Sequence, residues 1–369
     1  MRAFPSGDRA PAADGPDFAT PVFATLPDLA SRRLGGSVMY ATDELFAAKE
    51  NLINPSPPVF AAGEFGAKGK IYDGWESRRR REPGNDHALI RLGVPGVVHG
   101  VAVDTAFFRG NYPPEVSVEA VSVDGYPSAA ELGQLEWRPL VGRAAAAGDA
   151  VNWYAVTAPR HCTHVRLSIY PDGGVARLRV HGEAFPDPRF LTGTIDLAAL
   201  ESGGRLIECS DAFYSSAWNL IMPGRAAGMA DGWENARRRD GGLDYATFCL
   251  AAEGVVGQIE IDTSYFVGNA PGSARLLGAT LRPSDPSDPS DPSDPLSAAG
   301  WAELLPRVGL QPDTVHRFLV EPAEPVTHVR LEVFPDGGLA RLRVLGEITP
   351  GAQCSLDERY RAARRQGVA

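Results

Sequence analysis

THVRLSIYPDGGVARLRVHGE, residues 163–183, recurs at residues 327–347 as THVRLEVFPDGGLARLRVLGE. Sixteen of the 21 positions are identical, and three more exchange similar apolar groups. In both copies apolar and polar residues alternate before and after PDGG, as in strands that bury one face. Because PDGG is a turn sequence, the pattern predicts a β-hairpin in each half of the chain, with its two strands paired across the turn.

Further blocks repeat in the same order, which indicates two homologous domains. DGWESRRRRE at 73–82 returns as DGWENARRRD at 231–240, and VDTAFFRGNYP at 103–113 returns as IDTSYFVGNAP at 261–271. The sequence therefore predicts five parts, namely a flexible leader (1–20), a first repeat (21–185), a linker (186–196), a second repeat (197–350) and a C-terminal tail (351–369).

The composition favours many short strands over long helices. The chain has 40 glycines and 31 prolines, residues that form turns and interrupt helices. Helical patterns are confined to 43–53, 211–221 and 357–366. Four Ser-Asp-Pro triplets within 283–296 predict a disordered surface insertion, because their prolines exclude helix and strand pairing. The predicted fold class is all-β, with two tandem jelly-roll β-sandwich domains related by internal duplication.

The charge and the apolar pattern exclude several classes of partner. The 369 residues carry a net charge of −10, so the overall field repels nucleic acid and anionic lipid. No apolar run approaches the roughly 20 residues of a membrane-spanning helix, and the N-terminus lacks the apolar core of a signal peptide. The four cysteines form no CxxC pair. The sequence thus predicts a cytoplasmic protein without a disulfide framework or zinc site.

The loop that begins at Asp73 concentrates groups that could carry chemistry. Asp73 and Glu76 flank an indole and Arg78–Arg81 follow, so the loop could bind a small anion and provide a carboxyl for proton transfer. The same residue types recur at 231–240, so the carboxylates could equally serve only to hold their own arginines. Both interpretations stay open, whereas Trp75 is expected to pack inside the domain.

A second group of candidates follows a predicted strand. Asp104 and Asn111 lie where the strand-like VVHGVAVDT segment runs into a loop rich in glycine and proline, a common position for site residues. Asp104 could instead close an Asx turn, and Asn111 could be a tolerated left-handed residue. The first repeat also has polar side chains where the second has apolar or small ones, and these are Lys49, Glu50, Glu64, Lys68 and Lys70. Ordinary surface variation also explains Lys49 and Lys70.

Four composite motifs resemble the allantoicase family. They are LASRRLGGSVMYATDELFAAKENL (29–52), GEFGAKGKIYDGWESRRRR (63–81), NDHALIRLG (85–93) and VDTAFFRGNYPPEVSVEA (103–120). The resemblance extends over both repeats, from about Leu29 to Glu347. It implies two jelly-roll domains similar to galactose-binding modules, hydrolysis of allantoate to ureidoglycolate and urea, and assembly into homo-oligomers. Family members more often carry His-Asp-Trp where this chain has Asn-Asp-His, so no catalytic role is assigned to His87.

Under this resemblance the candidate residues acquire roles. Allantoate is a carboxylate whose central carbon carries two ureido groups, and losing urea requires a proton on the leaving group and water at that carbon. We expect Glu76 or Glu64 to act as the acid, and Asp104 or Asp73 to act as the base. The residues expected to bind substrate are Lys68, Arg79, Arg80 and Asn111. The second repeat contains counterparts of the catalytic and substrate-binding residues. They are Asp231, Glu234, Arg237, Arg238, Asp262 and Asn269.

Two alternatives remain at this level. Folds of this class include non-enzymatic tandem carbohydrate-binding modules, and an allantoicase-like chain could have lost its activity. No cofactor is predicted, because the histidines show no HxH, HxxxH or HExxH spacing, although clustered carboxylates could hold a divalent cation. The expected partner is the small molecule allantoate, with no nucleic acid and no membrane.

Overall fold

The computed structural model describes most of the chain. The described residues are 20–60, 63, 65–66, 69–70, 72–281, 296, 300–321 and 324–368. Glu64 and Lys68, two of the predicted site residues, lie outside them, as do all but the last residue of the predicted leader and all but the last residue of the insertion predicted at 283–296.

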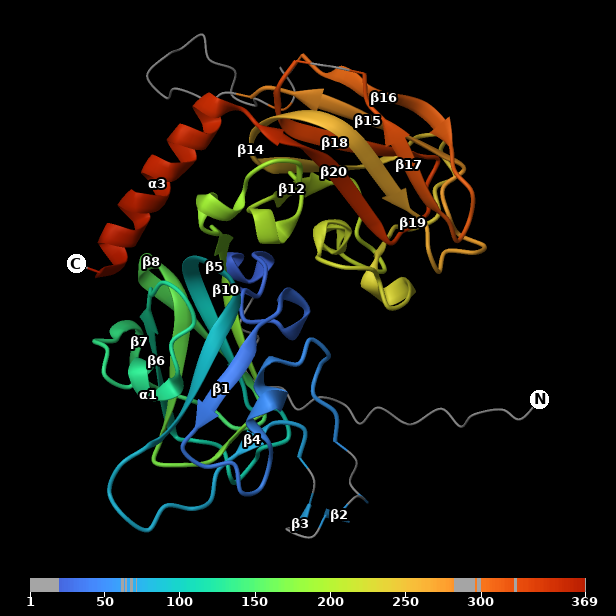
Figure 1. The fold of residues 1–369 in the computed structure, drawn as a ribbon. Coiled ribbons are helices and arrows are strands. Elements are labelled where there is room, and N and C mark those ends of the chain that lie inside the picture. Colours follow the sequence, from blue (N-terminus) through green and yellow to red (C-terminus); the bar gives the residue numbers. More distant parts are fainter. Residues whose placement is uncertain are drawn as a thin grey trace, which may run out of the picture.

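The first domain is a β-sandwich, the lower body in Figure 1. Its main sheet has the strand order β1-β5-β8-β6-β7, with β10 paired to β5 as well. These strands are β1 (Ser37–Ala41), β5 (Asp86–Asp104), β6 (Glu115–Val121), β7 (Arg138–Ala145), β8 (Val151–Tyr170) and β10 (Arg177–Ala184). Two short pairs join β2 (Phe65–Gly66) to β3 (Gly69–Lys70) and β4 (Trp75–Glu76) to β9 (Gly174–Val175). Its helical turns are η1 (Val22–Thr25), η2 (Arg32–Leu34), η3 (Lys49–Ile53) and α1 (Ala129–Leu132).

The second domain repeats this plan. Its sheet has the order β11-β20-β14-β18-β15-β16, with β12 and β17 also paired to β14, and β13 pairs with β19. The strands are β11 (Ile195–Asp196), β12 (Arg205–Cys209), β13 (Trp233–Glu234), β14 (Asp244–Asp262), β15 (Ser273–Ala279), β16 (Ala302–Gly309), β17 (Val315–Leu319), β18 (Val326–Phe334), β19 (Gly338–Leu339) and β20 (Arg341–Ile348). The helices are η4 (Pro188–Phe190), η5 (Leu200–Ser202), η6 (Ala217–Ile221), η7 (Met229–Asp231) and α3 (Pro350–Val368). The prediction of an all-β chain with two duplicated sandwiches is confirmed.

The long strand β5 forms part of both layers of its sandwich. Its 19 residues would span about 60 Å if the strand were straight. The segment 171–176 nevertheless connects the two ends of β5. At the start of the strand, Asp86 N–H donates to Pro171 O (3.2 Å), and at its end Asp104 O accepts from Ala176 N–H (2.7 Å). Six residues reach at most about 20 Å, so β5 must bend back on itself. Its register with β8 shifts between Arg91 and Gly96 and again between Val98 and Gly100.

The predicted hairpin is wrong in its pairing. Strands β8 and β10 do precede and follow PDGG, but β8 pairs with β5 and β6, while β10 pairs with β5. PDGG therefore carries the chain from one end of the bent strand to the other instead of pairing β8 with β10. In the second domain β18 and β20 both pair with β14 in the same way. Alternation and turn residues predict strands and a turn, but they do not name the partner of each strand.

The helical windows predicted near the start of each repeat are also shorter than expected. Only the 3-10 turns η3 and η6 form there, while the tail predicted at 357–366 does form part of α3. In the first repeat the preceding residues are extended because Ala47 pairs with Glu76. Tertiary pairing thus overrides the local helical preference. The stretch 186–196, expected to be a linker, holds η4 and also β11, which pairs with β20.

The two domains share an interface. Leu34 and Val94 of the first domain pack into the apolar core of the second. Arg33 donates to Asn219 Oδ1 (3.4 Å) and forms an ion pair with Asp231. Helix α3 leaves the second domain and runs back toward β8 of the first (Figure 1), where Tyr360 packs edge-on against a histidine and a phenylalanine. These contacts hold the sandwiches in one arrangement.

Candidate functional site

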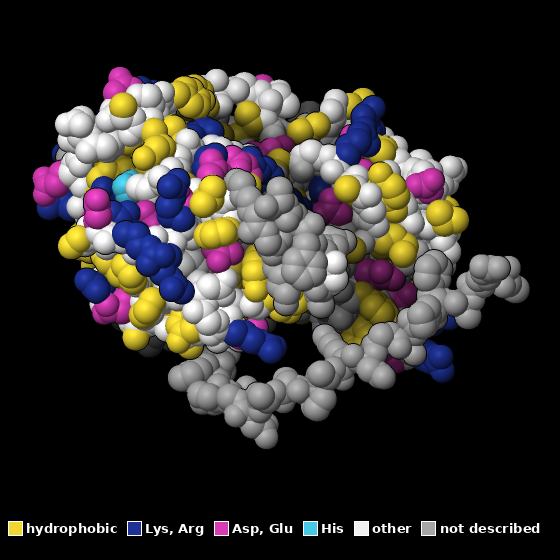
Figure 2. Space-filling model, turned by 90° about the horizontal axis from the view of Figure 1, so that it is seen from below, with side chains coloured by type: hydrophobic (Ala, Val, Ile, Leu, Met, Phe, Trp, Pro, Cys, Tyr) yellow, Lys and Arg dark blue, Asp and Glu magenta, His cyan; other side chains and the backbone are white. Residues whose placement is uncertain are grey.

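The loop predicted to carry chemistry lies at the end of the first sandwich where the two ends of β5 meet. Trp75 is fully buried and its indole N–H donates to Asp43 O (2.7 Å), which confirms it as a packing residue. The next residue, Glu76, pairs with Gly174 of β9 on one side and with Ala47 on the other. Figure 2 looks onto the molecule from this side, and lysine and arginine side chains lie there beside acidic ones. The backbone of Glu76 is thus fixed between two neighbours.

The PDGG turn, residues 171–174, holds this loop by a hydrogen bond. Asp172 Oδ2 accepts a hydrogen bond from the backbone N–H of Arg80 (2.8 Å). Gly173 has φ +141°, a conformation that L side chains rarely adopt, and a Cβ at Gly174 would overlap the ring of Phe108. The turn needs both glycines, Gly173 for its backbone conformation and Gly174 for the close approach of the Phe108 ring.

Glu76 and Asn111 form the central pair of the candidate site. Asn111 Nδ2 donates to Glu76 Oε1 (2.7 Å), and Asn111 O accepts from Gly174 N–H (2.7 Å). Burial raises the pKa of Glu76 above its ordinary value, and the hydrogen bond from Asn111 opposes that effect only in part. No other side chain among the described residues hydrogen-bonds to this carboxyl group. Glu76 is therefore suited to hold and release a proton.

The arginines after Glu76 divide into paired and free groups. Arg78 Nε donates to Asp43 Oδ2 (2.6 Å), and Arg80 Nη1 donates to the buried Asp86 Oδ1 (2.8 Å). Arg79 is exposed, and no described residue forms a hydrogen bond or ion pair with it. Of the two arginines predicted to bind substrate, Arg79 is available and Arg80 holds the fold.

Asp73 belongs to a separate cluster. The buried Arg177 donates to Asp73 Oδ2 (2.6 Å) and to Asp73 O (2.9 Å), and it also donates to Ser56 O (3.0 Å). Burial alone would raise the pKa of Asp73, but the hydrogen bonds from Arg177 and from Val59 N–H lower it below its ordinary value. Asp73 is accordingly a charged anchor for the loop.

Asp104 starts the other predicted loop. Its Oδ1 accepts from Ala106 N–H (2.8 Å), which closes the Asx turn that the sequence offered as the alternative to a catalytic role. Burial raises the pKa of Asp104, although two arginines of β10 oppose the shift. Phe107 follows with φ +69°, an uncommon conformation for a bulky residue, and Asp149 Oδ1 accepts its N–H (2.8 Å). Strain of this kind is often found near functional sites.

The structure thus brings together only part of the predicted catalytic set. Glu76, Asn111 and the free Arg79 lie on neighbouring loops at one end of the domain. Asp73 and Asp104 lie by Arg177 instead. No hydrogen bond among the described residues connects Glu76 to either aspartate.

The second repeat contains the same framework. Asn269 Nδ2 donates to Glu234 Oε1 (2.6 Å), and Arg238 Nη1 donates to the buried Asp244 Oδ1 (2.8 Å). Asp231 accepts from Arg341, as Asp73 does from Arg177. The remaining predicted counterparts are Arg237, which is exposed, and Asp262, which is buried and closes an Asx turn at Ser264 N–H (2.8 Å).

The two repeats differ in charge around this common framework. The first has three cations at positions where the second has apolar residues, namely Lys49, Arg78 and Arg109 against Ala217, Ala236 and Val267. The aspartates that pair with Arg78 and Arg109 are kept in the second repeat as Asp211 and Asp313. Glu44 and Glu50, which pair with Lys49, are absent from the second repeat and offset that lysine, so Arg78 and Arg109 alone give the first site its less negative field for an anionic ligand.

Sequence reasoning missed the residues that hold the site in place. One is Asp43, which accepts hydrogen bonds from the indole of Trp75 and from Arg78. The other is Arg177, which donates to Asp73. A signal for both was present, because Asp211 and Arg341 occupy the matching positions of the second repeat. Charged residues retained in both copies are candidates for such structural pairs.

Two other kinds of site were sought within the described residues. They contain no group of three or more histidine, cysteine, aspartate or glutamate residues able to hold a metal ion. None of the described helices is both long and apolar enough to cross a membrane.

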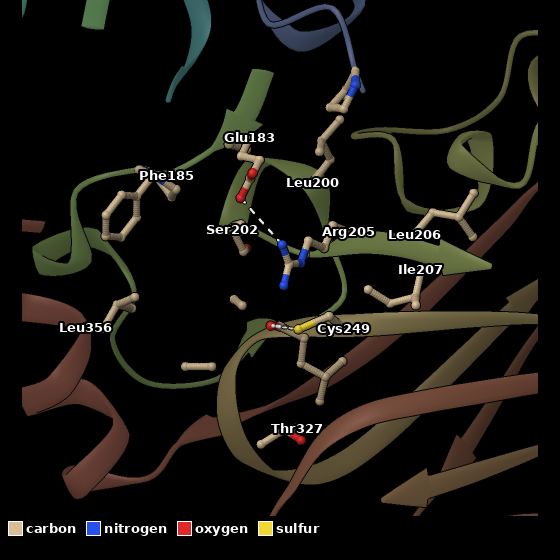
Figure 3. Close-up of a pocket in the computed structure, with 18 of the residues that line it drawn as sticks. Glu183, Phe185, Leu200, Ser202, Arg205, Leu206, Ile207, Cys249, Thr327 and Leu356 are labelled. Atoms are coloured by element: carbon tan, nitrogen blue, oxygen red, sulfur yellow. Dashed lines mark hydrogen bonds and ion pairs between the residues drawn. The ribbon is translucent and has the colours of Figure 1, made fainter. Parts of the chain in front are cut away.

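A cavity of about 920 Å³ lies between the two domains and α3 (Figure 3). Apolar side chains such as Phe185, Leu200 and Leu356 line it, and its ion pair joins Arg205 Nη1 to Glu183 Oε2 (3.4 Å). None of the predicted site residues lines this cavity. The loop end with Glu76 is the better candidate, because it combines the partly buried Glu76 carboxyl, whose pKa is raised, with the exposed Arg79, which pairs with no described residue.

Comparison with known proteins agrees with this duplicated arrangement. The family model described as the allantoicase repeat matches residues 27–185 and again residues 195–349. A probable allantoicase from Nocardia farcinica is 51% identical over 330 residues, which are 88% of this chain and 95% of the relative. A probable allantoicase from Streptomyces coelicolor is 45% identical, covering 96% of both chains.

The solved structures give the same result. The crystal structure of allantoicase from Saccharomyces cerevisiae superposes with a TM-score of 0.72 at 32% identity, covering 87% of this chain and 93% of that one. A further structure of an allantoicase gives the same TM-score over 86% and 92% of the two chains. Since both repeats match the family model and the relatives match over almost their whole length, the chain belongs to the allantoicase family.

Proposed function

We propose that this chain hydrolyses allantoate to ureidoglycolate and urea at the loop end of its first repeat. The observation that carries the proposal is the Glu76–Asn111 pair, in which a carboxyl with a raised pKa accepts one hydrogen bond from a neutral amide. The family membership supplies the substrate, and the alternative of a carbohydrate-binding module is not favoured.

Recognition of the substrate begins with its carboxylate. The exposed Arg79 has no partner among the described residues, so its guanidinium can bind that group in a bidentate manner. The amide of Asn111, already held against Glu76, can place a ureido group next to the acid. The first repeat is chosen over the second because of its less negative surroundings.

Cleavage then requires one proton and one water. Glu76, protonated, gives its proton to the ureido nitrogen that leaves as the C–N bond breaks, while the lone pair of the other ureido nitrogen forms a C=N bond to the central carbon. Water adds to that carbon and returns the electron pair to the nitrogen. The proton released by the water passes to the Glu76 carboxylate, which restores the acid. In sum one water is consumed and one urea is released.

In this mechanism Asp73 and Asp104 position the loops and do not act as the base. Asp73 is held by Arg177, which keeps it ionised and directed into the domain. Asp104 closes its own turn. The steps above use only side chains of this chain and water.

Two further properties belong to the proposal. A cytoplasmic location agrees with the four unpaired cysteines, Cys162, Cys209, Cys249 and Cys354. Assembly into homo-oligomers, which the family resemblance implies, is supported by the apolar side chains that the second repeat exposes at its loop end, Phe213 (70%), Tyr214 (66%) and Val267 (68%). Light scattering on the full chain gives the oligomer number.

The proposal is tested by incubating the purified protein with allantoate and quantifying urea and ureidoglycolate, with and without a chelator. We expect the two products in equal amounts and no effect of the chelator. A folded protein that releases no urea would refute the proposed activity, and loss of turnover with the chelator would refute the metal-free mechanism.

A further inference from the structure

Two arginines of the first repeat, Arg78 and Arg109, lie on the two loops that the Glu76–Asn111 pair joins. Arg78 is two residues after Glu76, and Arg109 is two residues before Asn111. Two residues extend at most about 7 Å, and the pair itself is closed by a hydrogen bond, so both arginines belong to the loop end that holds the acid. Neither takes part in the steps proposed above.

Arg78 lies on the same face of its segment as Glu76. Trp75 and Ser77 are buried, whereas Glu76 is half-buried and Arg78 is exposed. Ser77 N–H donates to Gly173 O (3.2 Å), so the segment stays extended beyond β4. In an extended segment, residues two apart point to the same side. The side chains of Glu76 and Arg78 are therefore available to one ligand.

Each of the two arginines is held at one atom. Arg78 Nε donates to Asp43 Oδ2 (2.6 Å), and Arg109 Nε donates to Asp149 Oδ2 (2.8 Å). Their Nη1 and Nη2 groups form no hydrogen bond with any described residue, and the two side chains are 64% and 80% exposed. A guanidinium fixed at Nε has less rotational freedom to lose on binding, while its terminal N–H groups stay free for a ligand.

The second repeat shows that the loop of Asp43 does not need its arginine. Asp43 Oδ1 accepts from Arg78 N–H (2.7 Å), and Asp211 Oδ1 accepts in the same way from Ala236 N–H (2.8 Å). The backbone contact is thus kept, although alanine replaces the arginine. Asp211 Oδ2 accepts no hydrogen bond from the part of the chain that the structure describes.

The other loop gives the same result independently. Asp149 Oδ1 accepts from Phe107 N–H (2.8 Å), and Asp313 Oδ1 accepts from Tyr265 N–H (2.7 Å). The arginine of this loop is replaced by Val267 in the second repeat, and Asp313 Oδ2 then has no hydrogen-bond donor among the described residues. The aspartates therefore hold the loops in both repeats, and both arginines are additions found only beside Glu76.

We propose that Arg78 and Arg109 determine the specificity of the first-repeat site by binding the two ureido groups of its substrate. This inference rests on the proposed function. The Nη groups of each arginine donate to the carbonyl oxygen of one ureido group, in a charge-assisted hydrogen bond, while Arg79 binds the carboxylate. Three guanidinium groups thus match the three acceptor groups of allantoate, with the Glu76–Asn111 pair among them.

Steady-state kinetics of Arg78→Ala, Arg109→Ala and the double variant test the proposal. We expect kcat/KM for allantoate to fall about tenfold in each single variant and about 100-fold in the double variant, because each substitution removes one charge-assisted hydrogen bond. Melting temperatures should stay unchanged, since exposed ion pairs contribute little to stability. Unchanged kcat/KM in both single variants would overturn the inference and leave the proposed function standing.

Arg317→Ala is the matched control. Arg317 is 70% exposed and its Nε donates to Glu260 Oε2 (2.9 Å), so it forms the same kind of pair on the second domain. Its replacement should leave kcat/KM unchanged. A loss equal to that of Arg78→Ala would show that the effect does not belong to the first-repeat site.

A probe with a single ureido group tests the assignment of the contacts. N-carbamoylglycine carries one ureido group and one carboxylate, so it can lose only one of the two contacts. Its Ki as a competitive inhibitor should rise about tenfold in the double variant, against about 100-fold for allantoate, and the Ki of acetate should not change. Equal losses with all three compounds would reveal a general attraction of anions and refute the binding of ureido groups.

Lysine variants separate the contacts from the charge. Arg78→Lys and Arg109→Lys keep the positive charge, but an ammonium group cannot hold the aspartate and donate to a ureido oxygen through a planar fork. We expect kcat/KM to stay at least about threefold below the wild-type value in each. Full recovery in both lysine variants would show that the field alone matters, which would overturn the inference.

Binding measurements keep the two proposals distinguishable. A folded wild-type protein that releases no urea refutes the proposed function, and calorimetric titration with N-carbamoylglycine then tests the arginines by themselves. A Kd that rises about tenfold in the double variant would support the binding role of the arginines. An unchanged Kd, or no binding by the wild type, would refute it.

Discussion

At the scale of single residues, the neighbouring arginines 79 and 80 should behave in opposite ways. Arg79 is free and Arg80 pairs with the buried Asp86. Arg79→Ala should raise KM for allantoate about tenfold, the value of one charge-assisted contact, and leave the melting temperature unchanged. Arg80→Ala should lower the free energy of unfolding by about 3 kcal/mol, because it leaves Asp86 buried without its partner. Steady-state kinetics and urea denaturation of both variants test these assignments. A reversed pattern, or equal effects of the two substitutions, would contradict them.

The pH dependence of turnover also belongs to this scale. Glu76 must be protonated to act as the acid, so kcat/KM should be high at low pH and fall as the pH rises through the raised pKa of Glu76. The hydrogen bond from Asn111 lowers that pKa. Asn111→Ala should therefore move the falling limb of the pH profile to higher pH, whereas Asn269→Ala should leave it in place. A limb that stays fixed or moves to lower pH in Asn111→Ala would count against Glu76 as the acid.

The sequence predicted several residues of the candidate site and missed their supports. Glu76 and Asn111 could be selected because the residue types of two short motifs suit the chemistry. Their contact could not be foreseen, since 35 residues separate them in the chain. The partner of Asp73 lies 104 residues away on β10, so sequence alone left its structural and catalytic interpretations open.

At the scale of elements, the pairing of β4 with β9 holds Glu76 in place. A Cβ at Gly174 would overlap the ring of Phe108. Gly174→Ala should therefore displace β9, lower the free energy of unfolding by about 1–3 kcal/mol and reduce kcat, because the same glycine pairs with Glu76. Gly142→Ala is the matched control, since open space surrounds that glycine. Equal stability of the two variants in urea denaturation would show that this close approach does not matter.

The strands themselves were predictable, but their partners were not. Alternating residues located β8 and β10, and PDGG located the turn between them. The expected hairpin did not form because β5 pairs with β8 along its whole length and with β10 from Gly96 to Asp104, so that β5 lies between the two strands. The position of β5 between them depends on the packing of two layers, which a period of two residues does not record. The same limit applied to 43–53, where the pairing of Ala47 with Glu76 displaced the expected helix.

At the scale of the whole molecule, α3 ties the domains together through Tyr360. Its ring packs edge-on against His161 and Phe185, with centroids 5.2 and 5.6 Å away. Tyr360→Ala should lower the free energy of unfolding by about 1–3 kcal/mol at pH 7.5. Arg361→Ala, an exposed position on the same helix, should change it by less than about 0.5 kcal/mol.

The destabilisation in Tyr360→Ala should also depend on pH. Burial lowers the pKa of His161 to about 4, so its contribution to stability is present above the ordinary value near 6.5 and is lost as the pH falls toward 4. Water that enters beside residue 360 in the variant raises that pKa again. The variant should then lose less stability on acidification, and its difference from the wild type should shrink between pH 6.5 and 4.5. A difference that grows over this range in denaturant titrations would contradict the burial of His161 by α3.

The duplication separates the shared framework from the residues that belong to one site. Both repeats retain the glutamate–asparagine pair and the buried arginine beneath their loops. Around these shared parts, the first repeat carries arginines where the second carries apolar residues. We therefore place catalysis in the first repeat.

Turnover of allantoate by Glu76→Gln, measured beside the wild type and Glu234→Gln, tests that assignment most directly. Glutamine keeps the hydrogen bond to Asn111 and removes the proton that the reaction needs. We predict that kcat falls at least about 100-fold in Glu76→Gln with an unchanged melting temperature, and by less than about twofold in Glu234→Gln. Near-normal urea release by Glu76→Gln, or a large loss in Glu234→Gln alone, would contradict catalysis at the first repeat.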